Sequence, residues 1–183
     1  DLPNQELPPG WQFLHCIANA AAGGGSVFAD GVALAEALRA ADPAAFDILS
    51  RTPVPFRFHD ADTDIRARKP VIVTDAAGAV TEICYNAHIA AIVDLPVDRI
   101  EPWYAAYRTF MALTRDPAYT VSITLAPGEM AVFDNRRVLH GRTAFDPATG
   151  ARHLRGCYVD RGEWDSRLRV LARPRGAPGL AAE

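Results

Sequence analysis

Short apolar runs bounded by turn residues occupy both ends of the chain. Runs of this kind, flanked by Gly, Pro, Asn or Asp, predict β-strands. Two of them, 71–74 and 80–86, flank an Asp-Ala-Ala-Gly turn and predict a hairpin. The other predicted strands are 11–19, which we expect to be buried, and 26–30, 119–125, 130–134, 138–141 and 152–160.

Helical patterns lie in the middle of the chain and near its C-terminus. The longest one places Trp103, Tyr104 and Tyr107 at helical spacing, which favours packing in the core or against a subunit over a ligand-binding role. The segment 52–69 alternates Pro, charged and aromatic residues and predicts an edge strand that leads into an exposed loop. The predicted helices are 32–42, 44–51, 97–115 and 163–172.

This order of elements predicts the fold class. Many short strands with helices inserted in the middle favour a mainly β fold with inserted helices (α+β) over a parallel α/β sheet. A β-sandwich or jelly roll is the expected architecture. No internal repeat or change of composition divides the chain, so we expect one domain over 1–173 and a C-terminal tail over 174–183.

Composition limits the possible partners. The chain has 183 residues, is 49% hydrophobic and carries a formal net charge of −3, which is typical of a globular domain and excludes a disordered one. A near-neutral charge offers no basic surface for nucleic acid or an anionic membrane. No apolar run reaches the roughly 18 residues of a membrane span. We therefore expect a small molecule or another subunit as partner.

The cysteines and the first residues give two further expectations. Cys16, Cys84 and Cys157 lie far apart without CxxC spacing, which predicts neither a disulfide framework nor a zinc site and favours a reducing, cytoplasmic setting. Residues 1–4, Asp-Leu-Pro-Asn, are typical of the inside of a loop. We therefore expect a fragment that lacks its N-terminal part.

Two strands carry candidate chemistry. His140 ends a predicted strand beside Gly141, where an imidazole can approach iron, zinc or copper, although the pattern taken alone favours a structural role. The period of two in a strand places Arg152 and Tyr158 on one face of 152–160. A buried guanidinium needs an anionic partner, which is either a ligand or an internal Asp or Glu.

The other four histidines are weaker candidates. His15 alternates with apolar neighbours and is expected to be a hydrogen-bonded core residue. His59 lies in a charged segment and should be solvated, His88 is a possible pocket residue, and His153 should point away from Arg152.

Several motifs, in order along nearly the whole chain, resemble the γ-butyrobetaine hydroxylase family. Its members are iron(II)- and 2-oxoglutarate-dependent dioxygenases related to taurine and trimethyllysine dioxygenases. The resemblance implies a double-stranded β-helix (jelly roll), iron bound by two histidines and one carboxylate, ascorbate as reductant and a homodimer. The motifs are DLPN at 1–4, PGWQFLHC at 9–16, GGS at 24–26, DG at 30–31, FDNRRVLHGR at 133–142, RHL at 152–154 and GCYVD at 156–160.

The resemblance also assigns roles to individual residues. Asp1 matches the carboxylate of the family's His-x-Asp motif and His140 its distal histidine, so both are expected metal ligands. The proximal histidine would lie two positions before Asp1. Arg152 matches the arginine that binds the distal carboxylate of 2-oxoglutarate. Ser26 falls near the same carboxylate, although a serine that stabilises the glycine turn is an alternative.

Substrate residues are matched less completely. Tyr158 resembles a tyrosine of the family's substrate pocket, where aromatic rings surround a trimethylammonium group through cation–π attraction. A tyrosine packed in a core strand is the alternative. Asn86 matches one of two adjacent asparagines that help to hold the substrate carboxylate, but Tyr85 and Ile89 stand where the family has the second asparagine and an arginine.

The expected function is hydroxylation of a small trimethylammonium carboxylate, γ-butyrobetaine to carnitine, with iron(II), 2-oxoglutarate and O₂. Two alternatives stay open. One is a related dioxygenase that acts on a different small, amino-acid-like substrate. The other is a non-catalytic jelly-roll module that binds a ligand or forms a dimer.

Overall fold

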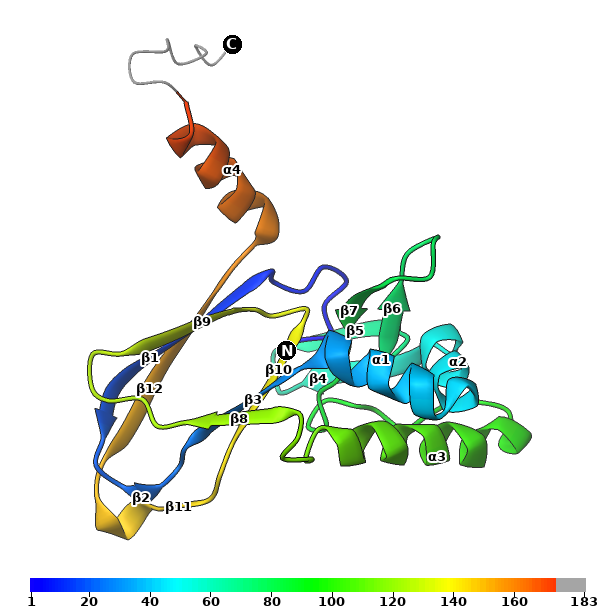
Figure 1. The fold of residues 1–183 in the computed structure, drawn as a ribbon, viewed down its shortest axis with the longest axis horizontal. Helices are drawn as coiled ribbons and strands as arrows, with labels where there is room; N and C mark the ends of the chain where they lie inside the picture. Colours follow the sequence, from blue (N-terminus) through cyan, green and yellow to red (C-terminus); the bar gives the residue numbers. More distant parts are fainter. Residues whose placement is uncertain (174–183) are drawn as a thin grey trace.

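A computed structural model describes residues 1–173 and places α1, α2 and α3 with the strands β4–β7 at one end of the molecule and the remaining strands at the other, with α4 projecting from them (Figure 1). The predicted tail, 174–183, lies outside the described residues. The helices are α1 (Gly31–Ala41), α2 (Pro43–Arg51), α3 (Val97–Leu113), the short 3₁₀ helix η1 (Pro147–Thr149) and α4 (Arg161–Leu171). The strands are β1 (Trp11–Asn19), β2 (Ala22–Gly23), β3 (Ser26–Asp30), β4 (Val54–His59), β5 (Asp64–Lys69), β6 (Ile72–Thr74), β7 (Val80–Ile83), β8 (Thr120–Ile123), β9 (Met130–Asp134), β10 (Val138–Arg142), β11 (Phe145–Asp146) and β12 (Arg152–Val159).

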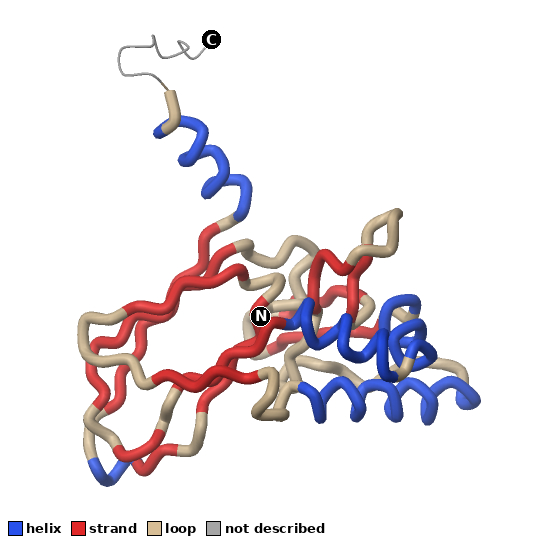
Figure 2. The backbone as a smooth tube through the Cα atoms, in the orientation of Figure 1, coloured by secondary structure: helices blue, strands red, loops and turns tan. Residues whose placement is uncertain are grey.

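Two antiparallel three-stranded sheets form the strand-rich end (Figure 2). In the first, β1 lies between β12 and β9, and Trp11 is the register partner of both Val159 and Asp134. In the second, β3 lies between β10 and β8, with His140 opposite Phe28. A short turn joins β9 to β10 and thereby connects the two sheets. Three two-stranded pairs, β2–β11, β4–β5 and β6–β7, complete the strand pairing.

The hydrophobic core lies at the helical end rather than between the sheets. Helices α1, α2 and α3 pack together with the β4–β5 and β6–β7 hairpins around fully buried side chains such as Leu34, Leu38 and Phe110. Trp103 is buried and stacks on Tyr107 with ring centroids 4.9 Å apart, so the expected packing role of this aromatic group is confirmed. None of the helices within residues 1–173 combines the length and the apolarity that crossing a membrane requires.

Two expectations for the strands are corrected. The strand predicted at the start of 52–69 is β4, but the exposed loop predicted after it is a strand, β5, that forms a hairpin with β4, in which Arg57 pairs with Asp64 at 2.8 Å. Most of the side chains of β5 are charged and exposed, so its composition resembles a loop although each of its residues has a register partner in β4. The other correction concerns β1, whose bounds agree with the prediction but which is buried only on the side of Gln12 and Cys16.

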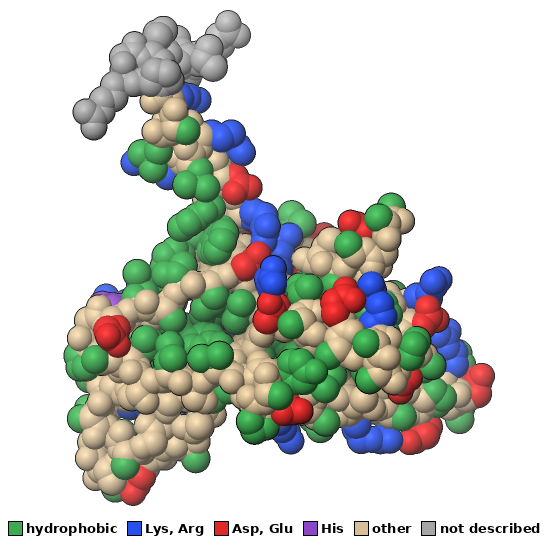
Figure 3. Space-filling model, viewed as in Figure 1, with side chains coloured by type: hydrophobic (Ala, Val, Ile, Leu, Met, Phe, Trp, Pro, Cys, Tyr) green, Lys and Arg blue, Asp and Glu red, His purple; other side chains and the backbone are tan. Residues whose placement is uncertain are grey.

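The other face of β1 carries half-buried aromatic side chains. Trp164 of α4 packs on Trp11, with ring centroids 4.9 Å apart, and lies 6.2 Å from Phe13. Apolar side chains gather over this end of the molecule and at the base of α4, whereas charged side chains are more frequent over the helical end (Figure 3). This contact between aromatic rings anchors α4, which otherwise projects away from the sheets (Figure 1).

Asp30 is the N-cap residue of α1, and its substitution tests how this helix is stabilised. Its Oδ1 accepts hydrogen bonds from the amides of Val32 (3.0 Å) and Ala33 (3.4 Å), and its carboxylate pairs with Arg137 at 2.6 Å. Since loss of an N-cap costs about 1 kcal/mol, Asp30→Ala should lower the free energy of unfolding by about that amount in urea titrations. Asp30→Asn keeps the cap acceptor and should lose less; equal losses in both variants would contradict this account.

The same residue gives a pH dependence. Partial burial alone would raise the pKa of Asp30, but hydrogen bonds from Arg137 and from the capped amides outweigh it and lower the pKa. A depressed folded-state pKa stabilises the fold above the unfolded value of about 4. This contribution is lost as the pH falls through the folded-state pKa. The difference in urea midpoint between the protein and Asp30→Asn should therefore shrink below pH 4.

Candidate active site

A cavity of about 900 Å³ opens between the two three-stranded sheets and the loop that follows β7. Its wall includes Leu14 and Leu154 from the first sheet and residues of β3 and β10 from the second. Five of the six predicted site residues line it: Asp1, Ser26, Asn86, His140 and Arg152. Segments that are far apart in the sequence thus converge on one space, which is typical of a ligand-binding or catalytic site.

The Asp1 carboxylate is held by side chains from two other parts of the chain. Asn86 Nδ2 donates to Oδ1 at 2.7 Å, and the Leu2 amide donates to the same oxygen at 2.9 Å. The Tyr158 hydroxyl donates to Oδ2 at 2.7 Å. Leu2 has a φ of 58°, and among residues 1–173 it is the one non-glycine residue with a positive φ. Backbone strain of this kind is concentrated at functional sites, and here it adjoins the candidate ligand.

His140 lies in β10 with its half-buried imidazole 5.2 Å from the Phe133 ring. Burial lowers the pKa of His140 to about 4. The imidazole is therefore neutral near pH 7, which is the form that binds metals. Asp1 and His140 both line the cavity.

Arg152 begins β12 and is half-buried without an acidic partner. Its Nε and Nη2 donate to the Gly24 carbonyl at 3.1 and 2.9 Å, and its guanidinium lies 5.5 Å from the centre of the Phe145 ring. Within residues 1–173 it forms no ion pair. The alternative of an internal Asp or Glu partner therefore finds no support within these residues, and a half-buried guanidinium that faces a cavity is suited to an anionic ligand.

Gly24 explains how the arginine reaches this position. Its φ of +71° favours glycine, and a Cβ there would come within 2.6 Å of Arg152 Nε. Ser26, two residues later, is buried and lines the cavity. Its hydroxyl makes no hydrogen bond to the preceding glycine turn within the described residues, so the turn-stabilising alternative finds no support.

The two expected substrate residues both contact Asp1. Asn86 faces the cavity, whereas Tyr158 is 39% exposed and lies outside the cavity wall, where it also accepts a hydrogen bond from Gln12 at 3.3 Å. Their positions identify them first as residues that orient the Asp1 carboxylate. A substrate contact for either one stays a prediction.

The remaining histidines lie elsewhere, with one exception. The prediction that His15 is a hydrogen-bonded core residue is wrong. His15 is half-buried on the face of β1 opposite Leu14, and its imidazole has no hydrogen bond within residues 1–173. His59 and His153 are exposed, as expected. His88 lines the cavity.

The donor set in the cavity fits one part of a metal site. A carboxylate and a neutral imidazole are ligands of non-haem iron(II), which also needs a second imidazole in the facial arrangement. No group of three His, Cys, Asp or Glu side chains that could hold a metal forms within residues 1–173. Asp1 and His140, which both line the cavity, stay predicted ligands.

Solved structures define the class of this fold. The chain superposes on AAD-2 in complex with Mn(II) and N-oxalylglycine with a TM-score of 0.68 at 17% identity, over 87% of this chain and 66% of the other. It superposes on an asparagine oxygenase in complex with Fe(II), 2S,3S-3-hydroxyasparagine and succinate with a TM-score of 0.64 at 24% identity, over 86% and 47% of the two chains. The fold, a mixture of helices and strands, is that of these oxygenases.

The sequence identifies the family. Residues 1–158 match the model of the taurine catabolism dioxygenase TauD, TfdA family, and the chain belongs to this family. It is 50% identical to the gamma-butyrobetaine dioxygenase of Pseudomonas sp. (strain AK-1) over 94% of this chain and 45% of that protein, and 38% identical to the human one over 93% and 46%. The mitochondrial trimethyllysine dioxygenase of Gallus gallus is 33% identical over 90% and 40%.

These comparisons confirm the resemblance to the γ-butyrobetaine hydroxylase family. The chain spans about half the length of the curated relatives that it matches. The comparisons leave the roles of individual residues as predictions.

Proposed function

We propose that this chain forms the catalytic part of an iron(II)- and 2-oxoglutarate-dependent dioxygenase that hydroxylates γ-butyrobetaine to carnitine. The observation that carries the proposal is the convergence of Asp1, His140 and Arg152 on one cavity of about 900 Å³. The identity of 50% to a gamma-butyrobetaine dioxygenase supports the choice of substrate. We propose further that the two three-stranded sheets are opposite halves of a double-stranded β-helix.

Each residue has a defined task in this proposal. Asp1 and His140 hold iron(II), which, when bound with 2-oxoglutarate, supplies the chemistry that activates O₂ for C–H hydroxylation. Arg152 binds the distal carboxylate of 2-oxoglutarate, with Ser26 beside it. Asn86 and the Tyr158 hydroxyl orient the Asp1 carboxylate, and apolar side chains of the cavity wall, Leu14, Val27, Leu139 and Leu154, exclude water.

The cavity wall also bears on the substrate. Tyr85 lines the cavity and stacks on Tyr107 with ring centroids 5.3 Å apart, so its ring is held rigidly. An aromatic face attracts a quaternary ammonium group by about 0.5–2 kcal/mol, which favours a trimethylammonium substrate. Tyr85 and Ile89 differ from the family's pattern at the carboxylate end. This departure favours, as the second candidate, a dioxygenase that acts on a different small, amino-acid-like substrate.

The test is succinate formation by the full-length gene product with iron(II), ascorbate and 2-oxoglutarate. We expect succinate and a hydroxylated product with γ-butyrobetaine, and much less with trimethyllysine or without substrate. If another small substrate gave more succinate than γ-butyrobetaine, that substrate would take its place in the proposal. Absence of substrate-dependent succinate would favour a non-catalytic binding module. Three further expectations stay predictions: the homodimer, the cytoplasmic setting and the use of ascorbate. Gel filtration of the full-length protein tests whether it is a dimer.

Gly24→Ala tests the position of Arg152 without changing that residue. An alanine at positive φ costs about 1–2 kcal/mol, and its Cβ would displace the guanidinium. We expect a loss of stability of that size together with a higher KM for 2-oxoglutarate. Gly128→Ala is the matched control, because Gly128 has a φ of +90° with no atom within 4 Å of an added Cβ. It should lose similar stability and keep its KM; an unchanged KM in both variants would contradict the role of Arg152.

A further inference from the structure

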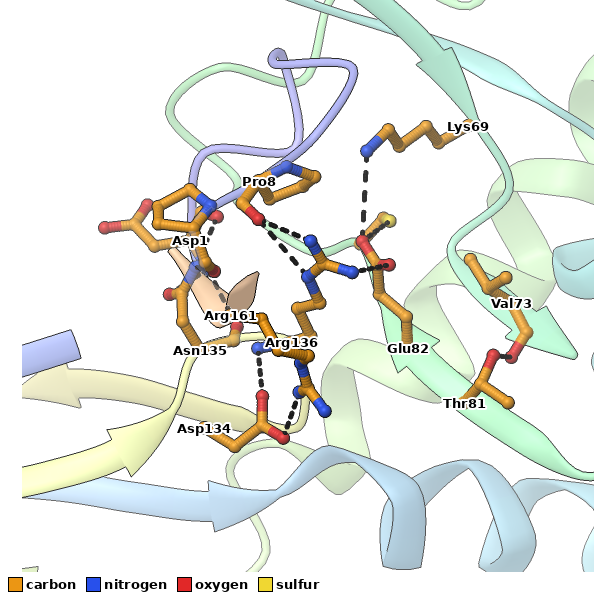
Figure 4. Close-up of polar contacts among 12 residues, drawn as sticks. Asp1, Pro8, Lys69, Val73, Thr81, Glu82, Asp134, Asn135, Arg136 and Arg161 are labelled. Carbon is orange, nitrogen blue, oxygen red and sulfur yellow. Dashed lines mark hydrogen bonds and ion pairs between the residues drawn. The ribbon is translucent and has the colours of Figure 1, made fainter. Parts of the chain in front are cut away.

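The turn between β9 and β10 places a fully buried amide against the main chain of Asp1. Asn135 is 2% exposed and lies in this turn, on the same hairpin as His140. Its Oδ1 accepts a hydrogen bond from the main-chain nitrogen of Asp1 at 2.9 Å, and its Nδ2 donates to the Asp1 carbonyl at 3.1 Å (Figure 4). The side chain thus pairs with both main-chain polar groups of Asp1, as a neighbouring strand would.

Asn135 has no unused donor in this arrangement. Its Nδ2 also donates to the Pro9 carbonyl at 2.9 Å, so both amide hydrogens and the amide oxygen have partners. Replacement by Asp would set a buried carboxylate against the Asp1 and Pro9 carbonyls, which is unfavourable for both charge and hydrogen bonding. The position therefore requires an amide rather than any small polar residue.

The turn itself is fixed on both sides. The Asn135 amide donates to the Gly10 carbonyl at 2.9 Å, and Arg136 donates to the Pro8 carbonyl through Nε at 3.2 Å and Nη2 at 2.8 Å (Figure 4). Asp134 pairs with Arg161 at 2.6 Å. Arg136 and Asn135 hold the same N-terminal segment, but Asn135 is the one whose side chain contacts Asp1.

We propose that Asn135 is a positioning residue that fixes the main chain of Asp1 relative to His140. This inference rests on the proposed function, since it takes these two residues as metal ligands. Asn86 and Tyr158 orient the Asp1 carboxylate through hydrogen bonds to its oxygens. Asn135 instead fixes the position of the Asp1 main chain, from which the side chain extends. One hairpin therefore provides one ligand, His140, and holds the other, Asp1, at a fixed separation from it.

The test measures metal affinity and ligand geometry as well as turnover. In the full-length protein, Asn135→Asp should raise the dissociation constant for Co(II) by roughly 10–100-fold, as is typical when a group that orients a ligand is lost. The absorption spectrum of the bound Co(II) should change with it, while the KM for 2-oxoglutarate stays near that of the unmodified protein. Asn135→Ser, which keeps a donor and is less disruptive to folding, should give a smaller change in the same direction.

Arg136→Gln is the matched control, because it weakens the hold on Pro8 without touching Asp1. We expect it to lower stability and to keep the Co(II) affinity and spectrum. The inference is overturned if the folded Asn135 variants bind Co(II) as the unmodified protein does, or if Arg136→Gln changes affinity and spectrum equally. Failure of the proposed function is distinguishable: it would appear as absent succinate formation in the unmodified protein, whatever the Co(II) affinities of the variants.

Discussion

His140→Ala is expected to abolish substrate-dependent succinate formation and to raise the dissociation constant for iron(II) more than about a hundredfold, since loss even of residues that only orient metal ligands costs about 10–100-fold. The half-buried imidazole lines the cavity beside Asp1 and is neutral near pH 7. Its removal leaves Asp1 as the one proposed metal ligand among the described residues of the cavity wall. Anaerobic equilibrium dialysis measures iron(II) binding, and succinate release measures turnover.

The control for this experiment is His153→Ala. His153 is exposed and lies on the face of β12 opposite Arg152, so its loss should leave iron(II) binding and turnover unchanged. Circular dichroism and thermal unfolding establish that both variants are folded. If a folded His140→Ala protein retained its iron(II) affinity, His140 would not be a metal ligand. The proposal that this cavity holds the iron(II) site would then be wrong.

Arg152→Ala is expected to raise the KM for 2-oxoglutarate by roughly thirtyfold or more, because truncating one partner of a buried charge pair costs about 2–5 kcal/mol. The guanidinium is oriented by the Gly24 carbonyl and meets no carboxylate within residues 1–173. Arg152→Lys keeps the charge but loses the planar fork, so an intermediate KM is expected. Initial rates over a range of 2-oxoglutarate concentrations provide the measurement.

Arg155→Ala serves as the comparison for this second result. Arg155 lies on the same strand, is exposed and has His15 as its register partner on the face away from the cavity. Its loss should not change the KM for 2-oxoglutarate. If both arginine variants raised the KM to the same extent, a general effect of positive charge would explain the data better than a specific contact of Arg152.

Local sequence patterns predicted the elements that are bounded by strong turn residues. The strands β1, β3 and β9 have the predicted bounds, because Gly, Pro or Asp residues flank each of them. The charged strand β5 was predicted as a loop, because it pairs with β4 along one edge without burying most of its side chains. The pattern of hydrophobic residues reflects which side chains are buried. A strand that buries few side chains, such as β5, therefore has only a weak hydrophobic pattern in the sequence.

The sequence predicted those site residues that lie in recognisable motifs of the family. The motif that contains His140 also contains Asn135, but no local pattern indicates that Asn135 contacts Asp1 at the other end of the chain. The same holds for the bond from the Tyr158 hydroxyl to Asp1 Oδ2. The Asn-Arg-Arg turn between β9 and β10 does not by itself show whether the amide of Asn135 stabilises the turn or positions another residue, because that depends on which distant backbone the turn contacts.

The three hydrogen bonds to the Asp1 carboxylate have a consequence for coordination number. Oδ1 accepts two of them, from Asn86 and Leu2, and so both of its lone pairs are engaged, whereas Oδ2 accepts one and keeps the other lone pair free. A carboxylate held in this way is set up for monodentate ligation through Oδ2. In the proposed function, Asp1 would therefore hold iron(II) through Oδ2, while Asn86 and the Leu2 amide keep the carboxylate oriented through Oδ1.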